Sequence, residues 1–347
     1  MEPGGPGPSL EKPSFRVSRV TMTARIETVR LALIVVASSF LVGSSALGQE
    51  FINQTEATQI VSNQSGPIED IPDVYYQYYV LRDRRGNTNL ARNTMYKVLG
   101  NGDVSLGKKR SVLVGLLNRT LIGSLGVGDT VVVPNQYDLD FRAYSPFPRF
   151  YAGGREFDKL FIIDKSIQAF AAYEKGRLTR WGIVNTGAKE SPTPNGRYNF
   201  NWRTEYRISS LSPTDEPWEM WWVFNFHQSR GIHIHQFAMP TGGPTSHGCV
   251  RLIDDDAMWV YGWADAWKTT AGDGFGSETA RLISPGTTVL VIGEDPGMKP
   301  EPFMRKKRIP VLKMIEFPEH PYDVPPGTPQ QEMFDRARLA QASESTR

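Results

Sequence analysis

Cysteine is almost absent from this chain, which has one, Cys249, in 347 residues. A lone cysteine cannot form a disulfide within its own chain, so a disulfide-stapled scaffold is excluded. The chain also lacks an excess of charge of either sign. Its 39 basic and 37 acidic residues leave a formal net charge of +2, which does not favour a nucleic-acid partner. What the chain does have is 39% hydrophobic residues, and 11% of all its residues are aromatic, which is enough for packed cores in a chain long enough for two domains.

The N-terminal region has the pattern of an export signal. Arg25 and Arg30 precede an apolar run from Leu31 to Val42, and small residues then lead to Ala46-Leu47-Gly48 before Gln49. This run is shorter than the roughly 20 residues of a membrane-spanning helix, which is the alternative. We therefore expect residues 1–48 to be a leader with a cleaved signal peptide, and no stable membrane span afterwards. The expected location is the periplasm or cell wall, and the start codon is left open between Met1 and Met22.

The single cysteine lies in Ser246-His247-Gly248-Cys249-Val250-Arg251-Leu252. A thiol with a pKa of about 8.5 needs a neighbouring base to act as a nucleophile at neutral pH. Two histidines, His233 and His235, lie just upstream, and a turn-rich segment separates them from the cysteine. An exported protein that keeps one free thiol is also a candidate for a reactive one. Both observations indicate a cysteine nucleophile.

These residues resemble the L,D-transpeptidase catalytic domain of the YkuD family, which has a strand histidine followed by Ser/Thr-His-Gly-Cys. The segments Thr186-Gly187-Ala188-Lys189 and Thr193-Pro194-Asn195-Gly196-Arg197-Tyr198 are similar to a second family motif. The resemblance covers roughly residues 155–294. It implies an acyltransferase that acts on peptidoglycan stem peptides through a thioester and uses no cofactor.

Within this resemblance, Cys249 is the expected nucleophile and a histidine the expected base. His233 and His235 point to the same face of a strand, about 7 Å apart. The family's usual apolar-x-apolar-His setting favours His235, with His233 as the alternate base. Backbone N–H groups of Gly248 and Cys249 are expected to bind the oxyanion.

Three further residues of the motif receive expected roles. The resemblance assigns Ser246 to orienting the imidazole, while Arg251 and His247 are candidate substrate-binding residues, Arg251 for a carboxylate.

Several functional alternatives remain open from the sequence. The acyl acceptor is a stem amine, a lysine of an envelope protein, or water, and water would make the enzyme an L,D-carboxypeptidase or amidase-like hydrolase. A different class of function is a structural zinc site, for which His233, His235, His247 and Cys249 are four possible ligands. Our expectation is nevertheless that the site binds no metal. A non-catalytic wall-binding protein is the third alternative.

The expected fold is α+β, mainly β with few helices, with a β-sandwich catalytic domain. Short apolar runs at 160–163, 167–173, 179–184, 219–226, 231–237 and 287–292 predict its strands. After the cysteine, Asp254 or Asp255 is expected to cap a helix whose Trp259, Trp263 and Trp267 share a face.

The expected boundaries divide the chain into five parts. They are a leader at 1–48, a flexible linker at 49–72, a small N-terminal lobe at 73–147, the catalytic domain at 150–294, and a disordered tail at 295–347 with a short helix near 330–339. In the lobe, residues 111–121 have helical spacing and 125–134 end in a β-branched run. The segment 116–134 weakly resembles half of a LysM module, and a family-specific lobe is the alternative. Arg305-Lys306-Lys307-Arg308 is interpreted as solvated tail charge.

Overall fold

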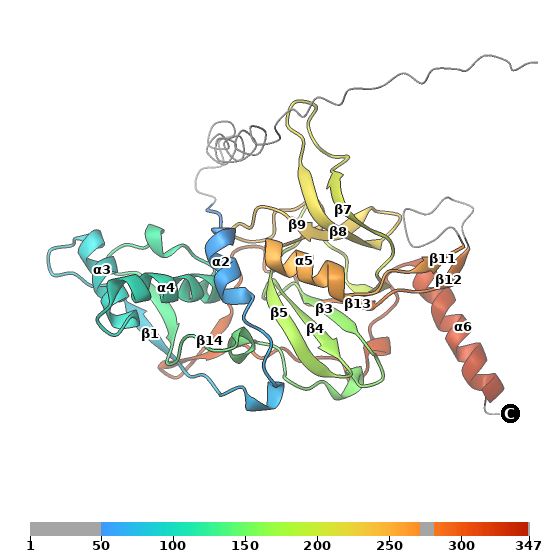
Figure 1. Ribbon diagram of the computed structural model, residues 1–347, viewed down its shortest axis with the longest axis horizontal. Helices are drawn as coiled ribbons and strands as arrows, with labels where there is room; N and C mark the ends of the chain where they lie inside the picture. The colour runs from blue at the N-terminus through green and yellow to red at the C-terminus, as the bar shows by residue number, and fades with distance from the viewer. Residues whose placement is uncertain (1–49, 271–280, 346–347) are drawn as a thin grey trace, which may run out of the picture. The chain divides into compact units, whose positions relative to one another are not determined.

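A computed structural model of the protein describes residues 50–270 and 281–345 (Figure 1). The expected signal peptide lies outside the described residues. Among the residues that are described, no helix is both long and apolar enough to cross a membrane.

One curled sheet dominates the described chain. Its strands are β3 (Leu160–Asp164), β4 (Ala169–Glu174), β5 (Arg177–Asn185), β6 (Gly196–Asn199), β7 (Arg203–Ile208), β8 (Glu219–His227), β9 (Ile232–Gln236), β10 (Val250–Leu252) and β13 (Thr288–Ile292). Their order is β6-β13-β3-β4-β5-β10-β9-β8-β7, antiparallel except for the β13–β3 and β10–β9 pairs. The mainly β, α+β prediction is confirmed, and the expected strands are all present.

The two halves of this sheet face each other across an apolar core. Although β6 and β8 are not neighbours in the strand order, the chain just after β6 contacts β8: the backbone amide of Asn201 donates to the carbonyl of Asn225 at 2.7 Å. The rings of Phe200 and Phe224 stack in the core with centroids 4.2 Å apart. The helix α5 (Asp254–Trp263) adds the buried Ala257 and Val260 to the same cluster. The sandwich is therefore made by curling one sheet.

Helix α5 differs from its prediction at both ends. Its N-cap is Ile253, with no side-chain cap, and Asp254 is already helical. The prediction that Asp254 or Asp255 caps the helix is therefore wrong. Asp255 and the next residue, Asp256, instead form ion pairs with Arg180 of β5. Trp259 and Trp263 stack 5.1 Å apart. Trp267 lies beyond the helix and packs against Trp202, Met220 and Val223.

The outer face of β3–β5 is covered by N-terminal elements. These are α2 (Gln54–Val61), η1 (Ile68–Asp70), η3 (Phe141–Tyr144) and η4 (Ala152–Gly154). Asn53 caps α2, and Ala57 and Val61 are fully buried against the sheet. The rings of Phe141 and Trp181 stack 4.5 Å apart. The prediction of a flexible linker at 49–72 is therefore wrong, because its few apolar residues are spaced to fill this face.

The N-terminal lobe is a β-α-α-β unit. It contains β1 (Tyr76–Val80), α3 (Thr88–Leu99), α4 (Val104–Asn118), η2 (Ile122–Ser124) and β2 (Thr130–Pro134), with β1 and β2 antiparallel. The expected helix and β-branched strand correspond to α4 and β2. The first half of this unit, which the sequence did not reveal, consists of β1 and α3. Leu81, directly after β1, packs in one cluster with Met95 and Leu99 of α3. The LysM resemblance stays a prediction.

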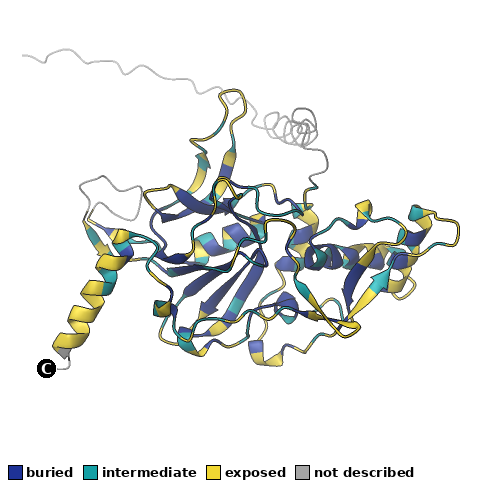
Figure 2. Ribbon diagram, turned by 180° about the vertical axis from the view of Figure 1, so that it is seen from behind, coloured by how far each residue is buried: buried dark blue, intermediate teal, exposed yellow. Residues whose placement is uncertain are grey.

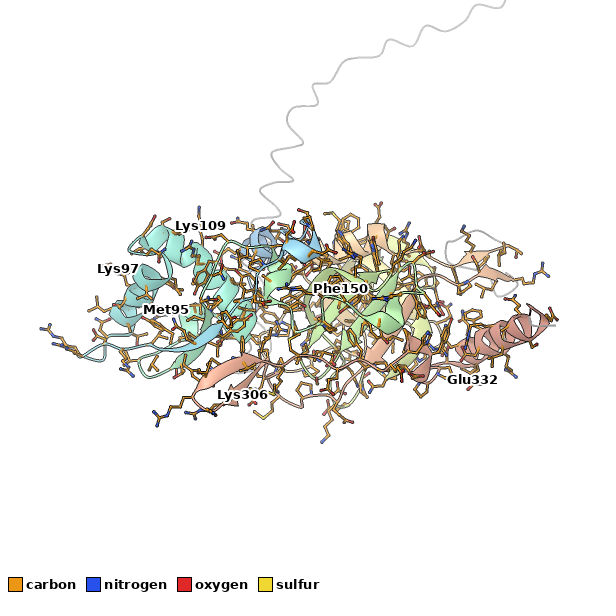
Figure 3. The ribbon with its side chains drawn as sticks, turned by 90° about the horizontal axis from the view of Figure 1, so that it is seen from below. Met95, Lys97, Lys109, Phe150, Lys306 and Glu332 are labelled. Atoms are coloured by element: carbon orange, nitrogen blue, oxygen red, sulfur yellow. The ribbon has the colours of Figure 1, made fainter. Side chains whose placement is uncertain are left out.

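The C-terminal segment is folded, so the predicted disordered tail is wrong. It contains the hairpin β14 (Phe303–Lys306) and β15 (Ile309–Leu312), η5 (Pro321–Asp323) and α6 (Pro329–Ser345). Earlier in the chain, β11 (Lys268–Thr269) and β12 (Leu282–Ser284) form a separate two-stranded sheet. Phe303 packs on Tyr76 of β1 at 5.1 Å, and Gln331 donates to Asn199 of β6 at 2.8 Å. The basic cluster surrounds the turn of this hairpin, where Figure 3 labels Lys306, while Glu332 lies near the start of α6. The predicted helix near 330–339 is present and longer. Figure 2 shows buried strands in the sheet and a largely exposed α6.

Candidate active site

The register of two parallel strands decides which histidine meets the cysteine. In the β9–β10 pair, Val250 is level with Ile234 and Arg251 with His235. One step earlier, Cys249 is therefore level with His233. The sulfur of Cys249 lies 3.6 Å from Nδ1 of His233. The expectation that His235 faces the sulfur is corrected by this contact, and the alternate histidine takes its place.

His235 lies one strand repeat further from the sulfur. Its Nδ1 is 2.9 Å from the carbonyl oxygen of Gln236, and its ring meets Phe237 edge-on at 5.9 Å. Both histidines are buried and share a face, as the alternation of β9 requires. The sequence could not separate them because only the register with β10 does so.

The loop before β10 is shaped by the side chain of Ser246. Its Oγ donates to the carbonyl oxygen of Cys249 at 2.5 Å and accepts from the amide of Gly248 at 3.1 Å. Gly248 has a φ of 112°, which favours glycine because a Cβ would be strained there. Ser246 thus holds the cysteine loop, and its described contacts do not include the imidazole of His233. The expected orienting role is corrected accordingly.

The second motif supports this loop from behind. The hydroxyl of Thr193 donates to the carbonyl of Gly248 at 2.8 Å and accepts from the amide of Gly187 at 3.0 Å. A Cβ on Gly187 would overlap the carbonyl oxygen of Ser191, so the two segments pack too closely for a side chain. The ammonium of Lys165 donates to the carbonyl of Thr193 at 3.0 Å. The Thr-Gly and Thr-Pro motifs therefore serve the geometry of the cysteine loop.

A cavity of about 380 Å³ opens over the sulfur, and its walls include Cys249, His233, His235, Ser246, His247 and Arg251. His247 is exposed and stacks on Trp218 with ring centroids 5.3 Å apart. Arg251 lies over the ring of Phe237 at 4.8 Å, with Nη1 3.4 Å from the hydroxyl of Thr245. The structure thus brings together the site residues that the sequence indicated.

Comparison with known proteins agrees with this arrangement. Residues 158–291 match the family model of the YkuD L,D-transpeptidase catalytic domain. This segment is a YkuD-type L,D-transpeptidase catalytic domain. No curated protein matches the chain.

Solved structures of L,D-transpeptidases are similar to parts of the chain. One from Xylanimonas cellulosilytica has 22% identity over 62% of this chain and 98% of its own, with a TM-score of 0.34. One from Stackebrandtia nassauensis has 22% identity over 40% and 57%, with a TM-score of 0.30. One from Mycobacterium smegmatis has 18% identity over 39% and 59%, with a TM-score of 0.31. The chain thus spans 59% of the length of the last of these.

The two imidazoles of β9, those of His233 and His235, are held neutral. Burial, with the charges of His235 and Arg207 adding to the shift, lowers the pKa of His233 to about 3. Burial likewise lowers the pKa of His235 to about 4, with the bond to Gln236 opposing and Arg251 adding to the shift. The ring of Trp202 meets His233 edge-on at 5.1 Å. This neutral His233 can accept a proton from the thiol.

The thiol is also held in its neutral form. Burial raises the pKa of Cys249, whereas the bond to His233 and the charges of Arg251 and Arg207 lower it. The sulfur also lies 3.9 Å from the carbonyl oxygen of Gly231. The resting pair is therefore a thiol beside an imidazole, and the proton moves only when a reaction needs it.

Several cavity residues of the transpeptidase domain were missed from the sequence. Trp202, Arg207, Trp218 and Met220 come from the β7–β8 hairpin and its approach, which projects from the sheet (Figure 1). The aromatic run in β8 was the available signal, because such a run forms either core or the wall of a groove. A bulge at Trp222, whose φ is 56°, shifts the alternation so that Met220 rather than Trp222 faces the cavity. Trp222 instead packs on Tyr261 of α5.

The residues of the zinc alternative, His233, His235, His247 and Cys249, line the same cavity but do not form a metal-binding group. Within 50–270 and 281–345, no group of three His, Cys, Asp or Glu side chains is arranged to hold a metal ion.

Proposed function

We propose that this protein is a cysteine-dependent L,D-transpeptidase that acts on peptidoglycan stem peptides. Cys249 is the nucleophile and His233 the base in this proposal. The observation that carries it is the 3.6 Å contact between the sulfur and Nδ1 of His233, inside a cavity of a YkuD-type domain. No described group other than His233 combines a basic ring nitrogen with this position.

The reaction begins with proton transfer from the Cys249 thiol to Nδ1 of His233. The thiolate attacks the carbonyl carbon between an L-centre residue and the terminal D-alanine, and the carbonyl oxygen becomes an oxyanion. The Cys249 amide is the proposed donor to that oxyanion, because the Gly248 amide already donates to Ser246. The imidazolium of His233 then gives its proton to the departing D-alanine amine, which leaves a thioester on Cys249.

The thioester is resolved by a second nucleophile. An amine of another stem forms a crosslink, a lysine of an envelope protein attaches that protein, and water gives a hydrolysed stem. In each case the C–S bond of the thioester breaks, and the proton that neutral His233 accepts from the attacking group passes to the departing Cys249 thiolate. Arg251 and His247 line the same cavity and are proposed to contact the substrate.

Product analysis tests this function. Purified residues 49–347 would be incubated with peptidoglycan fragments bearing tetrapeptide stems, with Cys249→Ser as the matched control. Mass spectrometry should show crosslinked dimers with loss of D-alanine, and a carbapenem should form a covalent adduct on Cys249. Shortened stems alone would indicate hydrolysis, and attached lysine-bearing peptides would indicate protein anchoring. No product and no adduct, from a folded sample with a reduced thiol, would contradict the proposal.

Export is part of the same proposal. Arg25, Arg30 and the apolar run after them favour cleavage near Gln49. The residues that follow are attached to the folded chain, since the carbonyl of Glu50 accepts from the amide of Thr241 at 2.9 Å. N-terminal sequencing of the mature protein should start near Gln49. Recovery of residues 31–46 in the mature form would overturn the cleaved-signal proposal.

A further inference from the structure

The wall of the active-site cavity is positively charged. Arg207, Arg230 and Arg251 line it, and the described lining contains no aspartate or glutamate. The three arginines come from different elements: β7, the β8–β9 turn and β10. Positive charge without acidic residues in the same wall favours a ligand that brings its own negative charge.

Arg207 lies close to the reacting groups. Its guanidinium carbon is 5.3 Å from the ring centroid of Trp202, the same ring that meets His233 edge-on at 5.1 Å. Its charge lowers the pKa of both the Cys249 thiol and the His233 imidazole. Arg207 therefore lies against the same Trp202 ring as His233, in the lining of the cavity that also contains Cys249.

Arg230 lies on the other strand connection of the cavity. It directly precedes Gly231, whose carbonyl oxygen is 3.9 Å from the sulfur. The side chain is exposed, and its Nη2 lies 3.3 Å from the neutral carbonyl oxygen of Pro192. A guanidinium in this position keeps donors available for a carboxylate that enters from solvent.

We propose that Arg207 and Arg230 bind carboxylates of the acyl donor, so that the enzyme selects stems with free carboxylates over stems whose carboxylates are amidated. This inference rests on the proposed function. A carboxylate accepts paired N–H donors from a guanidinium and carries the opposite charge. A carboxamide is uncharged, and its NH₂ group faces the guanidinium donors with donors of its own. Selection of this kind follows because a site built for one hydrogen-bonding pattern rejects its mismatch.

The test compares two donors in the same enzyme. One is a disaccharide-tetrapeptide with all carboxylates free, and the other has its internal carboxylates converted to carboxamides while the terminal D-alanine carboxylate is kept. Wild-type kcat/KM should favour the free form by about tenfold or more. Arg207→Gln and Arg230→Gln should each lower this preference several-fold, and the double variant should bring the ratio near one.

Controls separate recognition from other effects of the arginines. Loss of Arg207 also changes the reactivity of the thiol, but this change acts on both donors and cancels in their ratio. Arg155→Gln removes an exposed arginine that lies just before the transpeptidase domain and does not line the cavity, and it should leave the ratio unchanged. Arg207→Lys keeps the charge without the planar fork and should give an intermediate ratio.

Binding to an inactive variant keeps this inference distinct from the proposed function. Calorimetry with Cys249→Ser should show the same preference for the free-carboxylate stem as a ratio of Kd values. A ratio near one both in wild-type turnover and in binding to Cys249→Ser, or a turnover ratio that the double arginine variant leaves unchanged, would overturn the inference. Failure of turnover with a preserved Kd ratio would instead overturn the transpeptidase proposal and support the carboxylate site.

Discussion

At the scale of single residues, the two histidines of β9 have similar surroundings and different positions. Both are buried with lowered pKa values, and both point to the cavity side of the strand. Only His233 reaches the sulfur, because the parallel register places His235 beside Arg251. Proximity to the thiol is therefore our reason for proposing His233 as the base, since neither burial nor charge distinguishes the two rings.

His233→Ala and His235→Ala should have unequal effects on acylation. Removing His233 removes the proton acceptor, so the acylation rate by a carbapenem should fall about 10²- to 10⁴-fold. His235→Ala should retain measurable acylation, since its ring contacts Gln236 and Phe237. Stopped-flow acylation followed by intact-protein mass spectrometry would measure both. A larger loss in His235→Ala would restore the original sequence-based choice of His235.

At the scale of elements, the cysteine loop depends on a segment some fifty residues earlier in the chain. The hydroxyl of Thr193 joins the carbonyl of Gly248 to the amide of Gly187, and Lys165 fixes the Thr193 carbonyl. Lys165 is in turn paired with Asp295 at 3.0 Å. The loop is thus positioned by contacts from both ends of the domain.

Thr193→Val should lower activity by displacing the loop that carries Cys249, since Thr193 itself has no proposed part in the reaction. The substitution keeps the shape and removes both hydrogen bonds, at a cost of about 1–3 kcal/mol in the free energy of unfolding. A misplaced loop should lower kcat about 10- to 100-fold, because small shifts of reacting groups are costly. Thr179→Val, on β5, is the control. Wild-type kcat in a folded Thr193→Val protein would show that the loop holds its geometry without this bond.

The C-terminal segment is the other element whose role only the fold reveals. Leu312 and Val324 are buried, and Phe317 packs its ring against Tyr151 at 4.8 Å. The segment therefore completes the core that covers β3–β5.

A chain that ends at residue 296 should be much less stable than the full protein. Each buried apolar side chain lost costs about 1.5–3 kcal/mol, so the free energy of unfolding should fall by at least about 3 kcal/mol. Urea denaturation followed by tryptophan fluorescence would measure this. A chain that ends at residue 339 loses, among the residues whose burial is described, only the exposed residues 340–344 of α6, and it should match the full protein within about 0.5 kcal/mol. Equal stability of the 296 truncation would mean that the segment does not contribute to the core.

At the scale of the whole molecule, the free energy of unfolding depends on pH through buried groups that act in opposite directions: His233 and His235 on one side, and Asp256 on the other. His235 has a folded pKa of about 4 and ionises near 6.5 when unfolded, so it stabilises the fold above pH 6.5 and this contribution is lost as the pH falls through 4. His233, with a folded pKa of about 3, acts in the same direction. Asp256 opposes them: burial raises its pKa to about 6, so the folded state binds a proton before the unfolded state does.

His235→Gln should flatten the acid dependence of stability. Near pH 5 the unfolded wild type binds about one more proton than the folded state at this site, worth about 1.4 kcal/mol per pH unit. The slope of unfolding free energy against pH between 4.5 and 6 should therefore fall by about that amount in the variant. Asp256→Asn should change the slope in the opposite direction. Urea titrations across this pH range would measure both, and an unchanged slope in His235→Gln would contradict a buried neutral imidazole.

The sequence by itself determined the family, the cysteine loop and most of the strands, because motif spacing and alternating apolar residues are local properties of the chain. Tertiary structure decided what depends on distant partners. The register of β9 with β10 selected His233, and Arg180 drew Asp255 and Asp256 away from capping α5. Residues 49–72 and 295–347 are too polar to predict a core from their composition. Their described parts, residues 50–72 and 295–345, fold because each places a few apolar side chains on a sheet face that other parts of the chain leave uncovered.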